Sequence, residues 1–216
     1  MIDRCLNINN KLVVPAFKLN SMKITRRRFF SFVTVLPFIS LLSVTLRKQK
    51  NRLAPTPACD DHDEPTPAQT EGPYFTPNSP ERNNLRDKDV KGTVLIITGQ
   101  VLNTNCQPVN KALLDWWHAD DAGNYDNQGF TLRGHHYTDS QGNFRLETIV
   151  PGLYPGRTRH LHVKVQAPGK SVLTTQLYFP DEPGNQRDGI FKPVLLMQVA
   201  KEKAGLKAGY TFVLKA

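Results

Sequence analysis

From residue 93 onward the chain consists of short apolar runs separated by turn residues. The runs that we interpret as strands are Thr93–Val101, Ala112–His118, Phe144–Thr148, His160–Gln166, Val172–Phe179, Val194–Val199 and Tyr210–Leu214. Short β-branched and apolar runs bounded by Gly, Pro, Asn, Asp and Ser are typical of strands. No long stretch has the helical period of about 3.6 residues, and no internal repeat is visible. The pattern predicts an all-β fold, a β-sandwich with long loops.

Two of the predicted strands have one apolar face and one polar face. Side chains alternate between the two faces of a strand. The apolar face of the first carries Leu161 and Val165, and the apolar face of the second carries Leu173 and Leu177. The polar faces carry His160, His162, Lys164 and Gln166 in the first strand, and Thr174, Gln176 and Tyr178 in the second. Each strand therefore has one apolar face that can pack into a core and one polar face that is available for contacts outside the core.

The formal charge of +9 suggests a nucleic-acid partner until its location is considered. Residues 1–58 hold 11 Lys and Arg against one acid, Asp3, which gives +10. Residues 59–216 hold 17 Lys and Arg against 18 Asp and Glu, which gives −1. Because the basic residues lie in the leader, we expect no nucleic-acid partner.

The N-terminal region has the order of an export signal. The sequence TRRRFF at residues 25–30 leads into an apolar run, Phe29–Leu46. Twin arginines before a moderately hydrophobic segment are typical of the twin-arginine pathway, which carries folded and often cofactor-containing proteins. We expect export to the periplasm or cell envelope; the alternative is an uncleaved membrane anchor. Met22 would be a natural start for such a signal, so residues 1–21 are interpreted as an over-extended start.

The remaining organisation follows from composition and cysteine usage. Residues 1–46 are the predicted leader, 47–70 a Pro-rich linker and 71–216 the folded domain. Cys59 and Cys106 form an even pair in a chain expected to reach an oxidising compartment. We predict a disulfide between them, with two unrelated thiols as the alternative.

Candidate chemistry concentrates in the stretch YPGRTRHLHVKV, residues 154–165. His160 and His162 lie two apart on a strand, so both imidazoles leave the same face with Cα atoms about 6–7 Å apart. Tyr154 and Arg157 precede them, and Tyr125 follows an aromatic cluster at 115–118. The chain shows no EF-hand spacing, CxxC pair, HExxH motif or Gly-rich phosphate loop.

The donor types favour a hard, highly charged metal ion. A tyrosine must lose its proton to bind, and its free pKa near 10 resists that unless the ion lowers it strongly. Ferric iron can do this, as tyrosinate-bound haem shows. Two phenolates and a hydroxide also cancel a charge of +3, which favours the ferric over the ferrous state.

Four segments in order resemble the intradiol ring-cleavage dioxygenases, the family of protocatechuate 3,4-dioxygenase and catechol 1,2-dioxygenase. The segments are QTEGPYF at 69–75, DWWH at 115–118 with GNY at 123–125, YPGR at 154–157 with HLH at 160–162, and TQLYF at 175–179. The resemblance covers about residues 69–199. It implies a transthyretin-like β-sandwich without the N-terminal helical dimerisation domain of the catechol branch, for which this chain has no room.

The resemblance also implies the site residues. Tyr125, Tyr154, His160 and His162 would bind non-haem Fe(III). Arg157 and Gln176 would face the substrate, and Gly72 and Pro73 would border its pocket. Arg159 stands where small residues or proline are usual, and it either points at solvent or adds positive charge that favours an acidic catechol.

The implied reaction is the cleavage of a catechol-type ring by O2 to a muconic-acid-type product. As a hypothesis, Tyr154 leaves the metal and takes one substrate proton, and Arg157 stabilises negative charge that develops during reaction with O2. Catechol and O2 are the expected partners, and a homo-oligomer is the expected assembly.

Two other functions remain open from the residues alone. The first is a non-catalytic transthyretin-like binding module, since fold alone does not settle function. The second is a zinc-type hydrolase that uses the HxH pair, although no third ligand is marked. Among single residues, we expect one of Trp116 and Trp117 in the core and one at the surface, and His135 and His136 in a loop.

Overall fold

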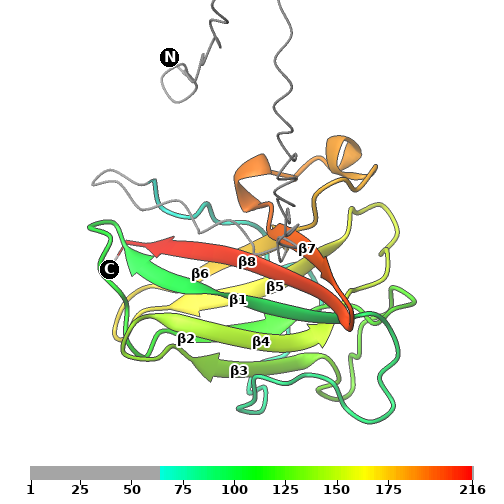
Figure 1. Ribbon diagram of the computed structural model, residues 1–216, viewed down its shortest axis with the longest axis horizontal. Coiled ribbons are helices and arrows are strands. Elements are labelled where there is room, and N and C mark those ends of the chain that lie inside the picture. Colours follow the sequence, from blue (N-terminus) through cyan, green and yellow to red (C-terminus); the bar gives the residue numbers. More distant parts are fainter. Residues whose placement is uncertain (1–63, 216) are drawn as a thin grey trace, which may run out of the picture. The chain divides into compact units, whose positions relative to one another are not determined.

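The computed structural model describes residues 64–215, which fold as two packed β-sheets (Figure 1). The first sheet has the order β4-β1-β8-β7 and the second the order β3-β2-β5-β6. The first comprises β1 (Val94–Asn103), β4 (Asn143–Ile149), β7 (Gln198–Glu202) and β8 (Gly205–Leu214). The second comprises β2 (Leu113–Trp117), β3 (Arg133–Tyr137), β5 (His160–Gln166) and β6 (Leu173–Tyr178). Two short 3₁₀ helices, η1 (Asn185–Arg187) and η2 (Pro193–Leu195), follow β6.

Neighbouring strands are antiparallel except for β1 and β8, which run parallel. Within the second sheet, Trp117 of β2 lies opposite His162 of β5, and His162 lies opposite Gln176 of β6. The register therefore places His162 between residues of both neighbouring strands. Within residues 64–215, no helix has the length and apolar character needed to cross a membrane.

The core lies between the two sheets and is built from the apolar faces. Leu161, Val163 and Val165 of β5 are fully buried there, together with Ile97 of β1 and Phe212 of β8. This confirms the alternation read from residues 160–166 and the all-β sandwich. The polar face of β5 is left for the site.

Most predicted strands are confirmed, with their ends shifted by one or a few residues, and 160–166 matches β5 without a shift. The predicted strand Val194–Val199 is wrong over its first four residues, because η2 ends at Leu195 and β7 begins only at Gln198. Strand β3 was not predicted at all. His135 and His136 lie in it, so their placement in a loop is wrong.

The N-terminal strap, residues 64–85, crosses the second sheet and is bonded to both sheets. Its first and last contacts go to the first sheet, where Thr66 N donates to Val213 O at 3.0 Å and Leu85 N to Glu147 O at 2.8 Å. Between them, the strap pairs with both edges of the second sheet: Gln69 N donates to Thr174 O at 2.9 Å, and Arg82 N donates to His135 O at 2.7 Å. Residues 64–70, assigned to the linker from their composition, thus lie along the sandwich.

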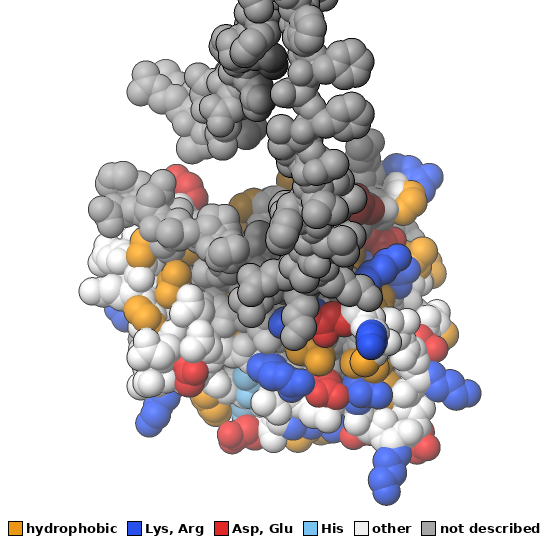
Figure 2. Space-filling view, viewed as in Figure 1, with side chains coloured by type: hydrophobic (Ala, Val, Ile, Leu, Met, Phe, Trp, Pro, Cys, Tyr) orange, Lys and Arg blue, Asp and Glu red, His pale blue; other side chains and the backbone are white. Residues whose placement is uncertain are grey.

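Positive and negative side chains are interspersed on the face shown in Figure 2. This agrees with the near-neutral charge of residues 59–216. The leader, the signal and Cys59 lie outside the described residues, so export and the Cys59–Cys106 disulfide stay predictions.

Candidate active site

Two buried histidines of β5 form the centre of the site. His160 and His162 are 5% and 3% exposed, and their Nε2 atoms lie 3.1 Å apart. Burial lowers the pKa of His160 to about 4 and the pKa of His162 well below its usual value. Both rings are therefore neutral at pH 7, the form in which an imidazole binds a metal.

Each histidine is held in orientation by its surroundings. His160 Nδ1 lies 2.6 Å from Thr158 O. A carbonyl only accepts, so Nδ1 carries the proton and the lone pair of Nε2 is left to face the centre. The His162 ring stacks on Trp117 with centroids 4.8 Å apart. Gly72, with φ of +73°, also borders this ring, and a Cβ there would lie 3.4 Å from His162 Cε1.

Three tyrosines gather beside the histidines. Tyr125 Oη lies 3.5 Å from His160 Nε2, and the rings of Tyr125 and Tyr154 are 5.9 Å apart. Tyr74 of the strap stacks on Tyr125 at 4.5 Å, and its hydroxyl lies 2.8 Å from that of Tyr154. Burial raises the pKa of Tyr125 to about 12, opposed by the charges of Arg157 and Arg133.

The donor set fits a metal ion. Two ligand atoms about 2.1 Å from one ion lie about 3 Å apart when they meet it at a right angle, close to the 3.1 Å between the histidine nitrogens. Among residues 64–215, no group of three or more His, Cys, Asp or Glu side chains could hold a metal. The candidate set pairs the two histidines with tyrosines, and the chain brings Tyr125, Tyr154, His160 and His162 together.

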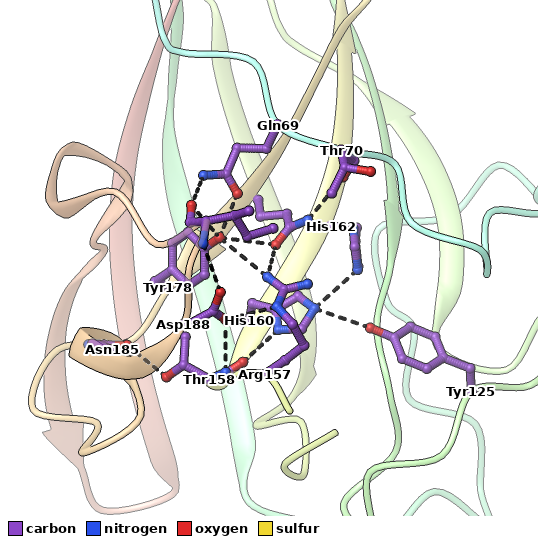
Figure 3. Close-up of polar contacts among 12 residues, drawn as sticks. Gln69, Thr70, Tyr125, Arg157, Thr158, His160, His162, Tyr178, Asn185 and Asp188 are labelled. Atoms are coloured by element: carbon purple, nitrogen blue, oxygen red, sulfur yellow. Dashed lines mark hydrogen bonds and ion pairs between the residues drawn. The ribbon is translucent and has the colours of Figure 1, made fainter. Parts of the chain in front are cut away.

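Arg157 lies beside the histidines and is fixed on two sides (Figure 3). Its Nε donates to Asp188 Oδ2 at 2.8 Å, and its Nη2 donates to Gln176 Oε1 at 2.7 Å. The Asp188 side chain is 2% exposed. The guanidinium is thus a fixed cation at the edge of the site.

Gln176 connects Arg157 to the strap. Its Nε2 donates to Thr70 O at 2.9 Å, and its Oε1 also lies 3.1 Å from Tyr178 Oη. Tyr178 Oη in turn donates to Gln69 Oε1 at 2.5 Å. The network in Figure 3 joins the polar faces of β5 and β6, as the alternation predicted. Gly72 borders His162, while Pro73 is the next residue of the same loop and is exposed.

Other residues differ from expectation. Trp116 and Trp117 are both buried, because Phe75 of the strap covers Trp117 at a centroid distance of 4.9 Å. Arg159 does not extend freely into solvent: its Nε donates to Glu182 Oε1 at 2.6 Å, and its Nη1 donates to Pro151 O. It ties two loops together.

Tyr74, Asp188 and Arg133 were missed by sequence reasoning. Tyr74 lies inside the quoted motif QTEGPYF, so its position was visible although its contact with Tyr154 was not. Asp188 lies 31 residues from Arg157 in a loop of no recognisable pattern. Arg133 belongs to the strand that was not predicted.

The sequence and fold match a known family. A family model described as Dioxygenase matches residues 70–215. The dioxygenase domain of a dioxygenase and carbohydrate-binding protein fusion from Streptomyces sp. SirexAA-E is 53% identical, with a TM-score of 0.70, over 71% of this chain and 99% of that one. The chain belongs to the intradiol ring-cleavage dioxygenase family.

Two further relatives have lower sequence identity. The 3-chlorocatechol 1,2-dioxygenase of Rhodococcus opacus 1CP is 31% identical, with a TM-score of 0.65, over 69% of this chain and 72% of that one. The hydroxyquinol 1,2-dioxygenase of Rhizobium sp. (strain MTP-10005) is 31% identical over 146 residues, which are 56% of this chain and 50% of the relative. The chain spans about half the length of the first two curated relatives it matches. Family membership thus rests on the sandwich domain.

Proposed function

We propose that this chain is a non-haem Fe(III)-dependent intradiol dioxygenase that cleaves a catechol-type ring with O2 to a muconic-acid-type product. The observation that carries the proposal is the convergence of His160 Nε2, His162 Nε2 and the Tyr125 hydroxyl beside a fixed arginine. The names of the relatives, which include catechol, chlorocatechol and hydroxyquinol 1,2-dioxygenases, support the substrate class.

His160, His162, Tyr125 and Tyr154 are the residues that would hold the iron. When bound, ferric iron supplies the Lewis acidity and electron-accepting capacity that bring a catecholate into reaction with O2. Tyr125 needs a cation at this position to lose its proton at neutral pH, because burial raises its pKa to about 12. The neutral histidines need no proton release to bind.

Tyr154 is placed to handle a substrate proton. Its hydroxyl lies 2.8 Å from that of Tyr74, and either group can donate. A Tyr154 phenolate that accepts a proton from a catechol hydroxyl can then donate it in a hydrogen bond to Tyr74. Tyr74 thereby provides a ready partner for the protonated form of Tyr154.

Arg157 supplies fixed positive charge where an anionic substrate would bind. Asp188 and Gln176 occupy its Nε and Nη2, and no described residue is bonded to its Nη1. A cation held in position before the reaction stabilises developing negative charge without reorganisation, and such a donor contributes about 3–4 kcal/mol in other enzymes.

Several parts of the function stay predictions. A homo-oligomer, export through the twin-arginine pathway and the absence of a nucleic-acid partner are proposed on the sequence alone. The alternative of a non-catalytic binding module does not call for two tyrosines to converge on a histidine pair.

The test is an absorption spectrum of the purified full chain with iron analysis, before and after anaerobic addition of catechol or protocatechuate. We expect about one iron per chain and a broad tyrosinate-to-iron band that shifts with substrate. Admission of air should then consume O2 and release a muconic-acid-type product. A protein that stays colourless after ferric reconstitution would favour the binding module.

A further inference from the structure

Arg133 is a buried cation that lies between the loop carrying Tyr74 and the loop that follows Tyr125. Its side chain sits at the start of β3 and is 2% exposed. Among the described residues, every hydrogen bond of the guanidinium goes to a main-chain carbonyl. Nη1 donates to Tyr74 O at 2.6 Å, while Nε and Nη2 donate to Asp126 O at 3.0 and 2.7 Å.

This bonding pattern is unusual for a buried charge. No carboxylate of residues 64–215 lies within ion-pair distance of Arg133. Burying a charge without a counter-ion is unfavourable unless its donors are satisfied in another way. Here each of the three guanidinium nitrogens donates to a main-chain carbonyl, and these carbonyls belong to Tyr74 itself and to the residue after Tyr125.

Besides Arg133, one other arginine joins the strap to the loop after Tyr125: Arg82 Nη2 donates to Phe130 O, at the far end of that loop. The loop after Tyr125 is closed internally by the Asp126 carboxylate, which accepts from the main-chain N of Gln128, Gly129 and Thr131. The Tyr74 loop contacts it through the stacked rings of Tyr74 and Tyr125. Arg133 adds a polar tie between their backbones.

We propose that Arg133 is a positioning residue that sets Tyr125 and Tyr74 against the histidine pair by holding the carbonyls of Asp126 and Tyr74 in one fork. The planar guanidinium offers donors in a fixed geometry that spans both carbonyls, whereas a lysine offers a single point charge. Through Tyr74, the same fork also places the hydroxyl that contacts Tyr154. The proposal rests on the proposed function only in its prediction for ferric affinity; its prediction for the two loops does not depend on iron.

The experiment uses the full-length chain with Arg133→Lys, which keeps the charge and removes the fork. The matched control is Arg145→Lys, an exposed arginine of β4 on the other sheet. Hydrogen exchange of the metal-free proteins is followed by mass spectrometry. We expect exchange to speed up about ten-fold or more in peptides covering residues 72–76 and 124–131, with β5 unchanged.

The second readout is ferric affinity, measured by competition with a chelator. We expect Arg133→Lys to lose about 10- to 100-fold in affinity, the usual effect of a residue that orients metal ligands. Unchanged exchange in either loop, or wild-type affinity in a chain that does bind iron, would overturn the proposal. If the wild-type chain binds no ferric ion, the proposed function fails, and the exchange data still decide whether Arg133 holds both loops.

An Arg133→Gln variant covers the case in which Arg133→Lys is poorly folded. Glutamine is neutral and can reach at most one of the two carbonyls. Selective loss of protection in both loops would support the fork. Loss of protection throughout the sandwich in both variants would refute it, because Arg133 would then be a determinant of the fold and not of the two loops.

Discussion

One carboxylate oxygen of Asp188 accepts two hydrogen bonds, from Arg157 Nε at 2.8 Å and from the main-chain N of Thr158 at 3.0 Å. Its other oxygen accepts Ile190 N at 3.1 Å. The Thr158 carbonyl in turn accepts His160 Nδ1. One buried carboxylate thus fixes both the arginine at the edge of the site and the segment that orients the first histidine.

Asp188→Asn should impair turnover more than iron binding. Asparagine keeps only one accepting oxygen and carries no charge, so it loses the ion pair with Arg157 and cannot make the bonds of both carboxylate oxygens. The arginine is then held less firmly, and small misplacements at a reacting centre can cost about 100-fold in rate. We expect kcat to fall about 10- to 100-fold, with iron content and colour retained. Steady-state kinetics and iron analysis on the same sample measure both. A variant with wild-type kcat would show that Gln176 alone holds Arg157.

Arg157→Leu should keep iron and colour and lose most turnover. Leucine removes the fixed cation without touching a candidate ligand, and loss of a comparable stabilising donor costs about 10²- to 10³-fold in kcat. Arg86→Leu is the matched control, since Arg86 forms a surface ion pair with Glu147. Full activity of the Arg157 variant would remove its assigned role.

Tyr74→Phe separates the hydroxyl of Tyr74 from its ring. The phenylalanine can still stack on Tyr125, but Tyr154 loses the hydroxyl 2.8 Å away. We expect normal iron content and a fall of about ten-fold or more in kcat, because general acid–base assistance is worth at least that much. Tyr137→Phe, an exposed tyrosine on β3, is the control. Equal kinetics in the two variants would argue against a proton partner at Tyr74.

The second sheet contains both a strand that the sequence predicts and a strand that it does not predict. The strand at 160–166 was predicted without error because its apolar and polar residues alternate, and that alternation also placed His160, His162 and Gln176 on the polar faces. Strand β3 has no apolar run, and it is a strand because it pairs with β2 and with Arg82 of the strap. Its role in the site was therefore invisible.

The misplacement of Trp117 has a related cause. Alternation on β2 puts Trp116 and Trp117 on opposite faces, and an outer face is normally exposed. Here the strap covers that face with Phe75, and His162 stacks on the same indole. A contact between segments more than forty residues apart leaves no local pattern in the sequence. The contact between Asp188 and Arg157, which are 31 residues apart, leaves no local pattern either.

His162→Ala should remove the metal. The variant deletes one of the two nitrogens that lie 3.1 Å apart. Loss of a residue that only orients a ligand costs about 10- to 100-fold in metal affinity. Loss of a ligand itself should therefore leave about a tenth or less of the wild-type iron. Iron analysis and the visible band after ferric reconstitution measure this. His135→Ala on β3 is the control and should retain iron. A coloured His162→Ala protein would exclude His162 from the ligand set.

His136 should make the fold sensitive to acid. It is 8% exposed, and neither ring nitrogen has a hydrogen-bond partner among the described residues. Burial, with a smaller contribution from His135, lowers its pKa from 6.5 to about 4. The folded state thus binds fewer protons than the unfolded state between these values, so stability is lost as the pH falls from about 6.5 to about 4, by up to about 3 kcal/mol. A leucine at this position cannot titrate. Urea titrations of the metal-free proteins give the unfolding free energies of wild type and His136→Leu. The difference between them should change by up to about 3 kcal/mol between about pH 6.5 and about pH 4. A difference that stays constant with pH would mean that His136 takes up its proton at the same pH in the folded and unfolded states, so that burial does not lower its pKa.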